Sequence, residues 1–244
     1  LSCGDIRTFG VMEAAASFDT VGLIARSVED INLFRNVLIG TPPAALPEVA
    51  INEARIGFAR TGFWNECDED TKAFLEGFAK TLAADGAAVS DVAMPVALDE
   101  VQEAHRWVSS FEFVRNRTFE IDHHWERISS ALRGGRIQDG MDCTFELYGE
   151  SRETLRRCAA LLDDVFKDYD VLLTPAVAGE APVGLTSTGN ASFSTLWTAL
   201  NIPAVTLPLH RGPNGMPVGL QFVSRRYADR MLLSIARAVS RKHG

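Results

Sequence analysis

Lysine is scarce in this chain, and none of the lysines lies where a catalytic base is expected. Among the 244 residues there are only Lys72, Lys80, Lys167 and Lys242. All four fall on the predicted solvent faces or at the ends of helices. The chain also lacks a glycine- and serine-rich loop that could present a nucleophile. Lysine-assisted serine catalysis therefore has no candidate residues within this sequence.

Motifs for metals, nucleotides and disulfides are also missing. Cys3, Cys67, Cys143 and Cys158 are far apart and form no Cys-x-x-Cys pair, which favours unpaired thiols over a metal or redox site. His123 and His124 are adjacent, so a helix would point them in different directions. There is no G-x-G-x-x-G, no phosphate loop and no G-x-S-x-G elbow. We expect no metal and no cofactor.

Long apolar runs and excess positive charge are absent too. The formal net charge of −8 argues against a nucleic-acid groove, which needs a basic face. No apolar run approaches the ~20 residues of a membrane span, and no secretory signal opens the chain. We therefore expect a cytoplasmic protein. Because the sequence begins with Leu rather than Met, we also expect it to start inside a longer protein.

The first part of the chain predicts an α/β layer. The segment around Arg7–Val11 predicts a short strand. Residues 27–49 predict a helix capped by Ser27, with an apolar stripe, followed by a proline-rich connection. Residues 55–94 predict a strand, a helix that begins at Asp68 and ends at Gly86, and a second strand.

Residues 98–167 predict mainly helices. Three apolar stripes at helical spacing mark them: one from Val101 to Phe111, one formed by Trp125, Ile128 and Leu132, and one from Leu155 to Val165. His105 lies in the first stripe, which is more typical of a partly buried histidine than of a catalytic base.

Residues 169–244 predict a strand, a loop, a hairpin and a closing helix. Tyr169–Thr174 reads as a strand buried on both faces, and a long loop leads to a short helix from Ser192 to Leu200. Two apolar runs joined by HRGPNGMP predict an antiparallel hairpin, and Tyr227–Arg241 predicts the last helix. The expected fold class is α/β, with a mixed β-sheet and helices packed on its faces.

Three segments, in this order, resemble the amidase signature family. They are SFDTVGLIARSVEDI (Ser17–Ile31), YDVLLTPAVAGEAPVG (Tyr169–Gly184) and the run from Ser187 to Leu233 that contains WTALNIPAVTLP and NGMPVGLQ. The resemblance covers nearly the whole chain, and its middle segment looks nearest to the malonamidase-like branch. Residues 1–244 would then be the C-terminal portion of an amidase domain whose N-terminal half is missing.

The resemblance implies an amidase that hydrolyses a carbon–nitrogen bond of a small carboxamide. The family uses a Ser–cis-Ser–Lys triad without a cofactor, and backbone N–H groups stabilise the oxyanion. No residue of this chain matches the triad, so we expect no catalytic residue here and no activity from this chain alone. The implied partners are a small amide substrate and the missing catalytic half. Self-association into a homo-oligomer is also expected, because strand edges would be exposed.

Four residues are predicted to shape substrate access: Thr174, Thr188, Trp197 and Asn201. Ligands in open α/β sheets lie beyond the carboxyl ends of strands, where Thr174 is placed. The alternative is that Trp197 belongs to the core and Asn201 caps a helix end. In the first segment, Ser17 is expected to fix the loop that enters the sheet. Asp19 and Arg26 are expected to brace it as an ion pair.

Two other functions remain open at this point. A truncated family member could bind a ligand or a partner without turnover. Alternatively, the chain could belong to the amidase subunit of a tRNA-dependent amidotransferase, which would need partner subunits. Ligand binding without hydrolysis would favour the first, and co-purifying subunits would favour the second.

Overall fold

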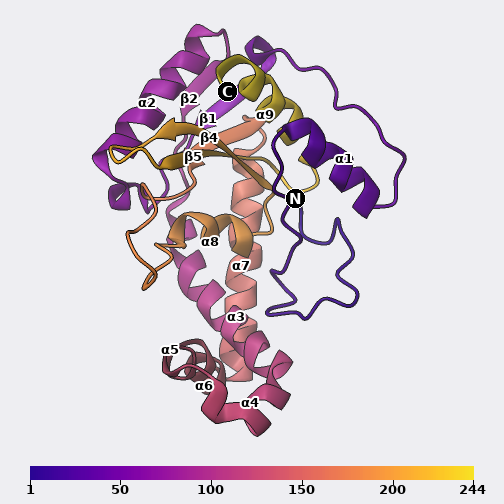
Figure 1. Ribbon diagram of the computed structural model, residues 1–244, viewed down its shortest axis with the longest axis vertical. Coiled ribbons are helices and arrows are strands. Elements are labelled where there is room, and N and C mark those ends of the chain that lie inside the picture. Colours follow the sequence, from indigo (N-terminus) through magenta and orange to yellow (C-terminus); the bar gives the residue numbers. More distant parts are fainter.

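A five-stranded mixed sheet forms the centre of the protein, whose computed structural model describes residues 1–244 (Figure 1). The strand order is β2-β1-β3-β5-β4. β1 pairs in parallel with β2 and β3, and β5 pairs antiparallel with β3 and β4. The strands are β1 (Arg55–Phe58), β2 (Ala88–Asp91), β3 (Val171–Pro175), β4 (Ala204–Arg211) and β5 (Pro217–Val223). The expected α/β fold with a mixed sheet is confirmed.

Helices cover both faces of the sheet. One layer holds α1 (Val28–Leu38), α2 (Glu69–Ala84) and α9 (Asp229–His243), and the other holds α3 (Val101–Asn116), α7 (Phe145–Val165) and α8 (Ser192–Ala199). In β3, Val171 and Leu173 join the first core cluster while Leu172 joins the second. This alternation follows from the two-residue period of a strand. All five β3 residues are buried, as the apolar run predicts.

The hairpin β4–β5 lies at one edge of the sheet. Its register shifts between Leu207 and His210, where β4 carries Pro208. A proline has no N–H to donate, so it is tolerated on an edge strand and not in the middle of a sheet. The predicted hairpin is thus confirmed, and β4 is left with one side unpaired.

The predictions for the first 40 residues are only partly right. Ser27 caps α1 as predicted, because its Oγ accepts the N–H of Asp30 at 3.1 Å. The apolar stripe of α1 is not buried along its length, however, since Phe34 is 59% and Val37 65% exposed. The predicted strand at Arg7–Val11 is wrong. The segment turns instead, with Gly10 at φ +82° and the Val11 N–H donated to the Thr8 carbonyl.

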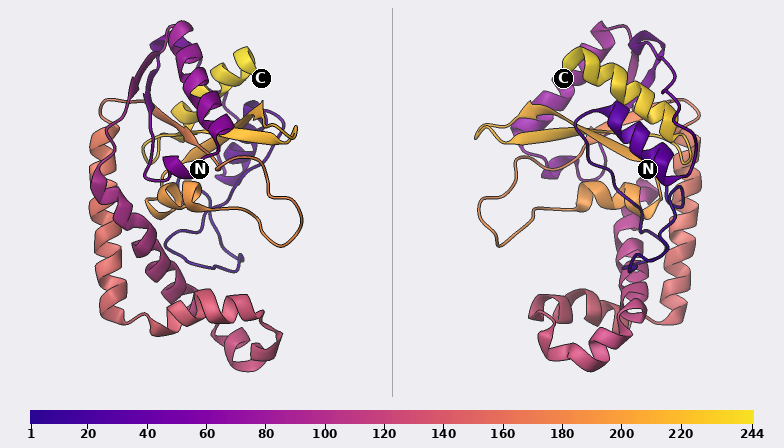
Figure 2. Two further views of the ribbon diagram at one scale, coloured as in Figure 1. Left: turned by 90° about the vertical axis from the view of Figure 1, so that its left-hand side faces the viewer. Right: turned by 45° about the vertical axis from the view of Figure 1, so that its right-hand side comes forward.

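Helices α3 and α7 run side by side away from the sheet and form an arm (Figure 2). The short helices α4 (Thr118–His124), α5 (Ser130–Leu132) and α6 (Gln138–Asp142) lie at its far end (Figure 1). Single turns complete the chain: 3₁₀ turns at Ile51–Glu53, Trp64–Glu66, Val96–Glu100 and Trp125–Arg127, and a π-helical turn at Arg133–Ile137. No helix combines the length and the apolar composition needed to cross a bilayer.

The stripe predicted from Trp125, Ile128 and Leu132 does not lie on one helix. Trp125 is in a 3₁₀ turn, Ile128 is extended, and Leu132 is in α5. The break occurs because Ser129 caps a new helix, its Oγ accepting the Leu132 N–H at 3.3 Å. The other two stripes are buried as predicted, in α3 and α7.

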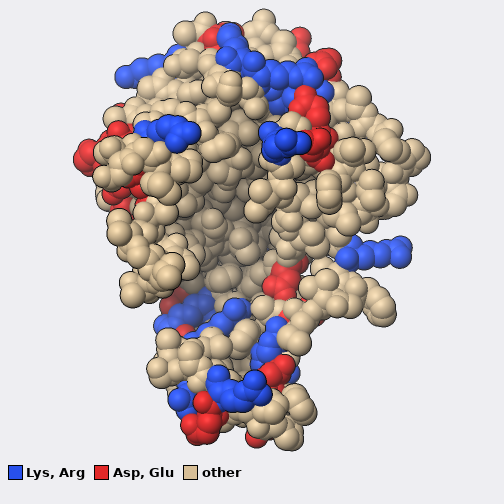
Figure 3. Space-filling view, in the orientation of Figure 1, with Lys and Arg blue, Asp and Glu red and all other residues tan.

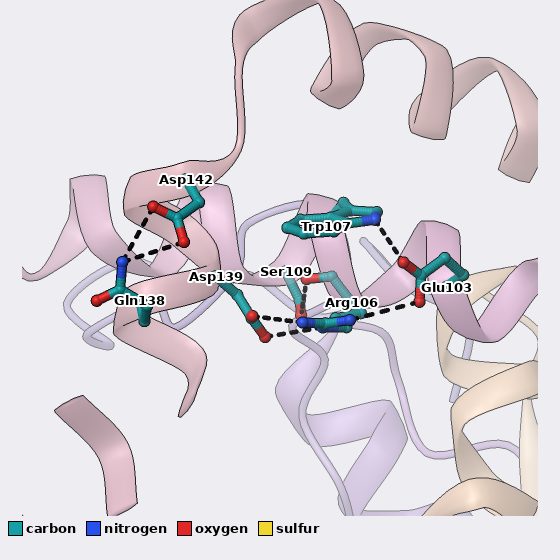
Figure 4. Close-up of polar contacts among 7 residues, drawn as sticks. All are labelled: Glu103, Arg106, Trp107, Ser109, Gln138, Asp139 and Asp142. Atoms are coloured by element: carbon teal, nitrogen blue, oxygen red, sulfur yellow. Dashed lines mark hydrogen bonds and ion pairs between the residues drawn. The ribbon is translucent and has the colours of Figure 1, made fainter. Parts of the chain in front are cut away.

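Polar contacts join α3 to α6 in the arm (Figure 4). Arg106 of α3 donates from Nε to one carboxylate oxygen of Asp139 on α6 at 2.8 Å, and from Nη2 to the other at 2.5 Å. Glu103 accepts the indole N–H of Trp107 at 2.7 Å. The Arg106 guanidinium holds the pKa of the Asp139 carboxyl below its ordinary value.

Candidate functional site

A cavity of about 170 Å³ lies where the N-terminal loop meets α8 and the hairpin. It is lined by Leu1, Cys3, Phe18, Thr20, Ser194, Trp197, Thr198, Asn201, Ile202, Ala204 and Gln221. The face seen in Figure 1 has a hollow in its middle whose walls are mostly uncharged side chains (Figure 3). Two of the four residues predicted to shape substrate access, Trp197 and Asn201, are brought together in this cavity.

Trp197 is both a core residue and a wall of the cavity. Its side chain belongs to the cluster beneath α8 and is only 2% exposed. The indole N–H nevertheless has no hydrogen-bond partner in the protein. A buried tryptophan usually finds a partner for this group, so an unpaired indole N–H in a residue that lines a cavity calls for an explanation.

Asn201 ends α8 in an unusual backbone conformation. It follows Ala199 and Leu200 and has φ +57°, in the left-handed region that asparagine tolerates better than most residues. Its N–H is donated to the Thr198 carbonyl at 3.1 Å, as expected of a residue that terminates a helix. The side-chain Oδ1 is buried without a partner, so Asn201, like Trp197, lines the cavity and carries an unpaired polar atom.

Gln221 is a site residue that the sequence analysis missed. It lies on β5, is 6% exposed, and its Oε1 has no partner. In register it faces Thr174 of β3 on one side and Thr206 of β4 on the other. The signal was a single glutamine inside the apolar strand VGLQFV, because a buried polar side chain among apolar ones needs an explanation.

Thr174 and Thr188 differ in their relation to the cavity. Thr174 is fully buried in β3, and its hydroxyl oxygen has no partner, but it does not line the cavity itself. It reaches the site only as the neighbour of Gln221 in the sheet. Thr188 is exposed on the loop between β3 and α8 and is not among the lining residues.

Ser17 holds the entry loop through a carboxylate of the arm. Its N–H is donated to Glu112 Oε2 at 2.9 Å and its hydroxyl to Oε1 at 2.5 Å. The Tyr148 hydroxyl also donates to Glu112, at 2.9 Å. Glu112 on α3 therefore ties the loop and α7 together, which is a fixing contact of the kind predicted for Ser17.

The predicted pairing of Asp19 with Arg26 is not formed. The Asp19 carboxylate accepts the backbone N–H groups of Ala14 at 2.6 Å and Ala15 at 3.1 Å. Arg26 is exposed and has no carboxylate within ion-pair distance. Asp19 stabilises a local turn instead of forming an ion pair across Gly22, because aspartate readily accepts hydrogen bonds from nearby backbone N–H groups.

The cavity contains binding groups and no activated nucleophile. Cys3 donates its S–H to the Asp19 carbonyl at 3.6 Å. Burial raises the pKa of this thiol, the positive charge of Arg226 opposes the rise, and the result remains above the ordinary value. A protonated thiol is a poor nucleophile. No lysine, histidine or carboxylate lines the cavity, and no group of three or more metal-ligating side chains occurs in the structure.

Several proteins of known name are similar to this chain in sequence. The chain is 28% identical over 246 residues to 2-amino-5-chloromuconic acid deaminase of Comamonas testosteroni, covering 93% of this chain and 52% of that protein. It is 25% identical over 264 residues to indoleacetamide hydrolase of Allorhizobium ampelinum, covering 97% of this chain and 57% of that protein. The chain thus spans about half the length of the curated relatives it matches.

The fold is shared with a solved amidase. That crystal structure superposes on the whole of this chain with a TM-score of 0.89 at 23% identity, over 57% of the amidase's own length. The sequence model of the Amidase family matches residues 2–233, which is nearly the full sequence. The three segments quoted above and the sheet with its two helical layers therefore have one explanation: the chain belongs to the amidase family.

Proposed function

We propose that residues 1–244 act as the substrate-side, C-terminal portion of an amidase domain that hydrolyses a carbon–nitrogen amide bond of a small carboxamide. The observation that carries this proposal is the cavity at Trp197, Asn201 and Gln221. Each of these three residues lines the cavity and has one buried polar atom without a partner in the protein, and no lysine, histidine or carboxylate lines the cavity. Such a set of groups suits binding and orientation more than bond breaking.

In this proposal the reacting groups lie outside these residues. A neutral lysine would take a proton through a bridging cis serine, and the second serine would attack the amide carbonyl, without a cofactor. Support comes from the lack of any lysine near the cavity and from relatives of about twice this length. The printed names of the two relatives, a deaminase and an amide hydrolase, also agree with carbon–nitrogen bond cleavage.

The unpaired side of β4 supports the proposal that the catalytic groups lie in another part of a longer protein. A groove of about 530 Å³ runs along β4 between the segment at Gly22–Ala25 and α9, and most of its lining residues are apolar. An edge strand beside an apolar groove is a ready place for a further strand to pair. We assign this edge to the catalytic part of a longer protein.

Each cavity residue has a proposed role. The Trp197 ring walls the acyl side of the substrate, and the Asn201 and Gln221 oxygens accept the N–H groups of the amide. Thr174 supports Gln221 from β3. Thr188 keeps the role in substrate access proposed from its loop.

The test begins with the coding DNA upstream of Leu1. We expect the frame to continue into a Gly/Ser-rich loop with an earlier lysine. The longer protein should release ammonia from small carboxamides, and the 244-residue chain should not. In the longer protein, Gln221→Leu should lower kcat/KM by roughly tenfold or more, as expected when a buried hydrogen-bonding group is lost. Gln102→Leu, on the exposed side of α3 and outside the cavity and the groove, is the matched control.

Other outcomes separate the competing functions. Hydrolysis by the 244 residues alone would overturn the assignment of catalysis to a separate part. Ligand binding by the longer protein without turnover would favour a binding protein. Co-purification of further subunits would favour an amidotransferase subunit, the function that its printed name gives to one relative from Homo sapiens at 24% identity.

A further inference from the structure

A second cavity, of about 320 Å³, adjoins the first and shares Phe18 and Asn201 with it. Its remaining lining residues come from the N-terminal loop, from α3, α7 and α8, and from the turn before α9. They are Ser17, Val108, Arg152, Leu155, Arg156, Ala159, Ala199, Leu200 and Arg226. One part of this lining is apolar, and the polar part contains three arginines beside Ser17 and Asn201.

The charge of this cavity is opposite to that of the chain. The protein has a formal net charge of −8, yet no acidic residue lines the cavity. Arg156 pairs with Glu153. Arg152 donates to the Tyr148 hydroxyl at 3.4 Å, and that hydroxyl in turn donates to Glu112. Arg226 donates to the Tyr227 hydroxyl at 3.2 Å, and neither Arg152 nor Arg226 forms a direct ion pair with a carboxylate.

The backbone around this cavity is strained at two points. Asn201 at φ +57° and Tyr227 at φ +66° are the only non-glycine residues with positive φ in the structure. The first lines the cavity, and the second directly follows Arg226, which does. Non-glycine residues adopt this conformation only when the surroundings enforce it, and such residues gather at functional sites.

A buried network enforces the conformation at Tyr227. The Ser2 hydroxyl accepts the Tyr227 N–H at 2.8 Å and donates to the Asp229 carboxylate at 2.7 Å. Asp229 is 2% exposed and also accepts the Ser2 N–H at 2.7 Å. The network fixes the turn that carries Arg226, and the Nε of Arg226 remains buried without a partner.

We propose that this cavity binds a small carboxylic acid with an apolar body. The carboxylate meets Arg226, with Arg152 and Arg156 beside it, because the planar guanidinium matches two carboxylate oxygens. The apolar body lies against Phe18, Leu155 and Leu200. The site differs from the amide site in its chemistry, since it binds an anion through arginines and needs no nucleophile, although the two cavities share Phe18 and Asn201.

Calorimetric titration of the 244-residue chain with benzoate and benzamide tests this site. The two compounds have nearly the same shape and differ in charge. We expect benzoate to bind at least tenfold more tightly than benzamide, and its affinity to fall as salt is raised. Arg226→Gln should lower the affinity for benzoate at least tenfold. Arg225→Gln changes the neighbouring exposed arginine, which does not line the cavity, and should leave the affinity unchanged.

Two results would overturn the proposal. One is equal binding of benzoate and benzamide, or binding of neither. The other is benzoate affinity that Arg226→Gln leaves unchanged. If Arg226→Gln does not fold, the double change of Arg152 and Arg156 to Gln on the surface of α7 provides the same test, with the same loss expected. Binding is measured without turnover, so failure of the proposed amidase function would not affect the result.

Discussion

The α/β body and the far end of the helical arm are held together in different ways. In the body, two core clusters of 21 and 18 buried residues cover the two faces of one sheet. At the far end of the arm, only Ile121, Ile137, Gly140 and Cys143 are buried within residues 117–147. Arginines stack on aromatic rings there instead, as Arg136 does over Phe113 at 4.5 Å. Buried area stabilises the body and the base of the arm, and polar and aromatic contacts contribute more at the far end of the arm.

The largest expected difference in stability comes from a Phe→Ala substitution made once in each region. Phe222 of β5 is 0% exposed in the body, whereas Phe145 at the start of α7 is 73% exposed. Phe222→Ala should lower the free energy of unfolding by about 3–5 kcal/mol, because a cavity is left in a packed core. Phe145→Ala should change it by less than about 0.5 kcal/mol. Urea denaturation followed by circular dichroism measures both, and similar losses would contradict the division into two regions.

The next largest loss of stability is expected at Gly140, where α6 packs closely against α3. A Cβ on Gly140 of α6 would lie 2.2 Å from the Ser110 carbonyl oxygen of α3, whereas one on Gly134 would meet nothing within 4 Å. We expect Gly140→Ala to destabilise the arm by about 1–3 kcal/mol through overpacking, and Gly134→Ala not to destabilise it. Hydrogen exchange should rise in residues 117–147 and stay unchanged in β3. Faster exchange in the sheet would mean that the two regions unfold together.

His105 lies on α3 where the arm joins the body, with its ring 4.7 Å from that of Phe18. Burial, together with the nearby charge of Arg136, lowers its pKa from 6.5 to about 4. As pH falls, the His105 side chain is therefore protonated in the unfolded chain before it is protonated in the folded one. The free energy of unfolding then falls as pH drops from about 6.5 towards 4. The wild type should lose about 1–2 kcal/mol more than His105→Phe between pH 7 and 4.5. Equal losses in urea titrations at the two pH values would argue for a solvated ring.

The smallest effect is expected from the ion pair in Figure 4. The side chains of Arg106 and Asp139 are 48% and 23% exposed, so solvent screens the pair. Asp139→Asn should cost less than about 1 kcal/mol, and added salt should shrink the difference. The lowered pKa of Asp139 means that any contribution is present above its ordinary value and is lost as pH falls through the lower one. A loss above about 2 kcal/mol would place this pair among the main supports of the arm.

The same contrast explains which parts of the fold the sequence predicts. In the body, apolar residues alternate or recur at regular spacing because a sheet or core lies on a defined side. α2, α9 and the hairpin were predicted for this reason. In the arm, Trp125, Ile128 and Leu132 have the right spacing without a core to face. Ser129, which starts a new helix, decides the structure there.

The candidate site was predicted less completely, because it joins segments distant in sequence. Trp197 and Asn201 were identified from one helix, but Gln221 reaches them through the pairing of β5 with β3 and β4. The positive φ of Asn201 cannot be read from the residue type. Asp19 had two possible partners, and the nearer backbone N–H groups took precedence over Arg26.

The Ser2–Asp229 contact has a consequence for how the protein tolerates damage. It joins two positions 227 residues apart, so Ser2 holds the turn that precedes the last helix. Ser2→Ala would release the Tyr227 turn without changing any residue of the arginine cavity. A cut in the exposed loop at residues 185–190 would leave the Ser2 contacts in place. The site at Arg226 is therefore more sensitive to one substitution at Ser2 than to a cut in that loop.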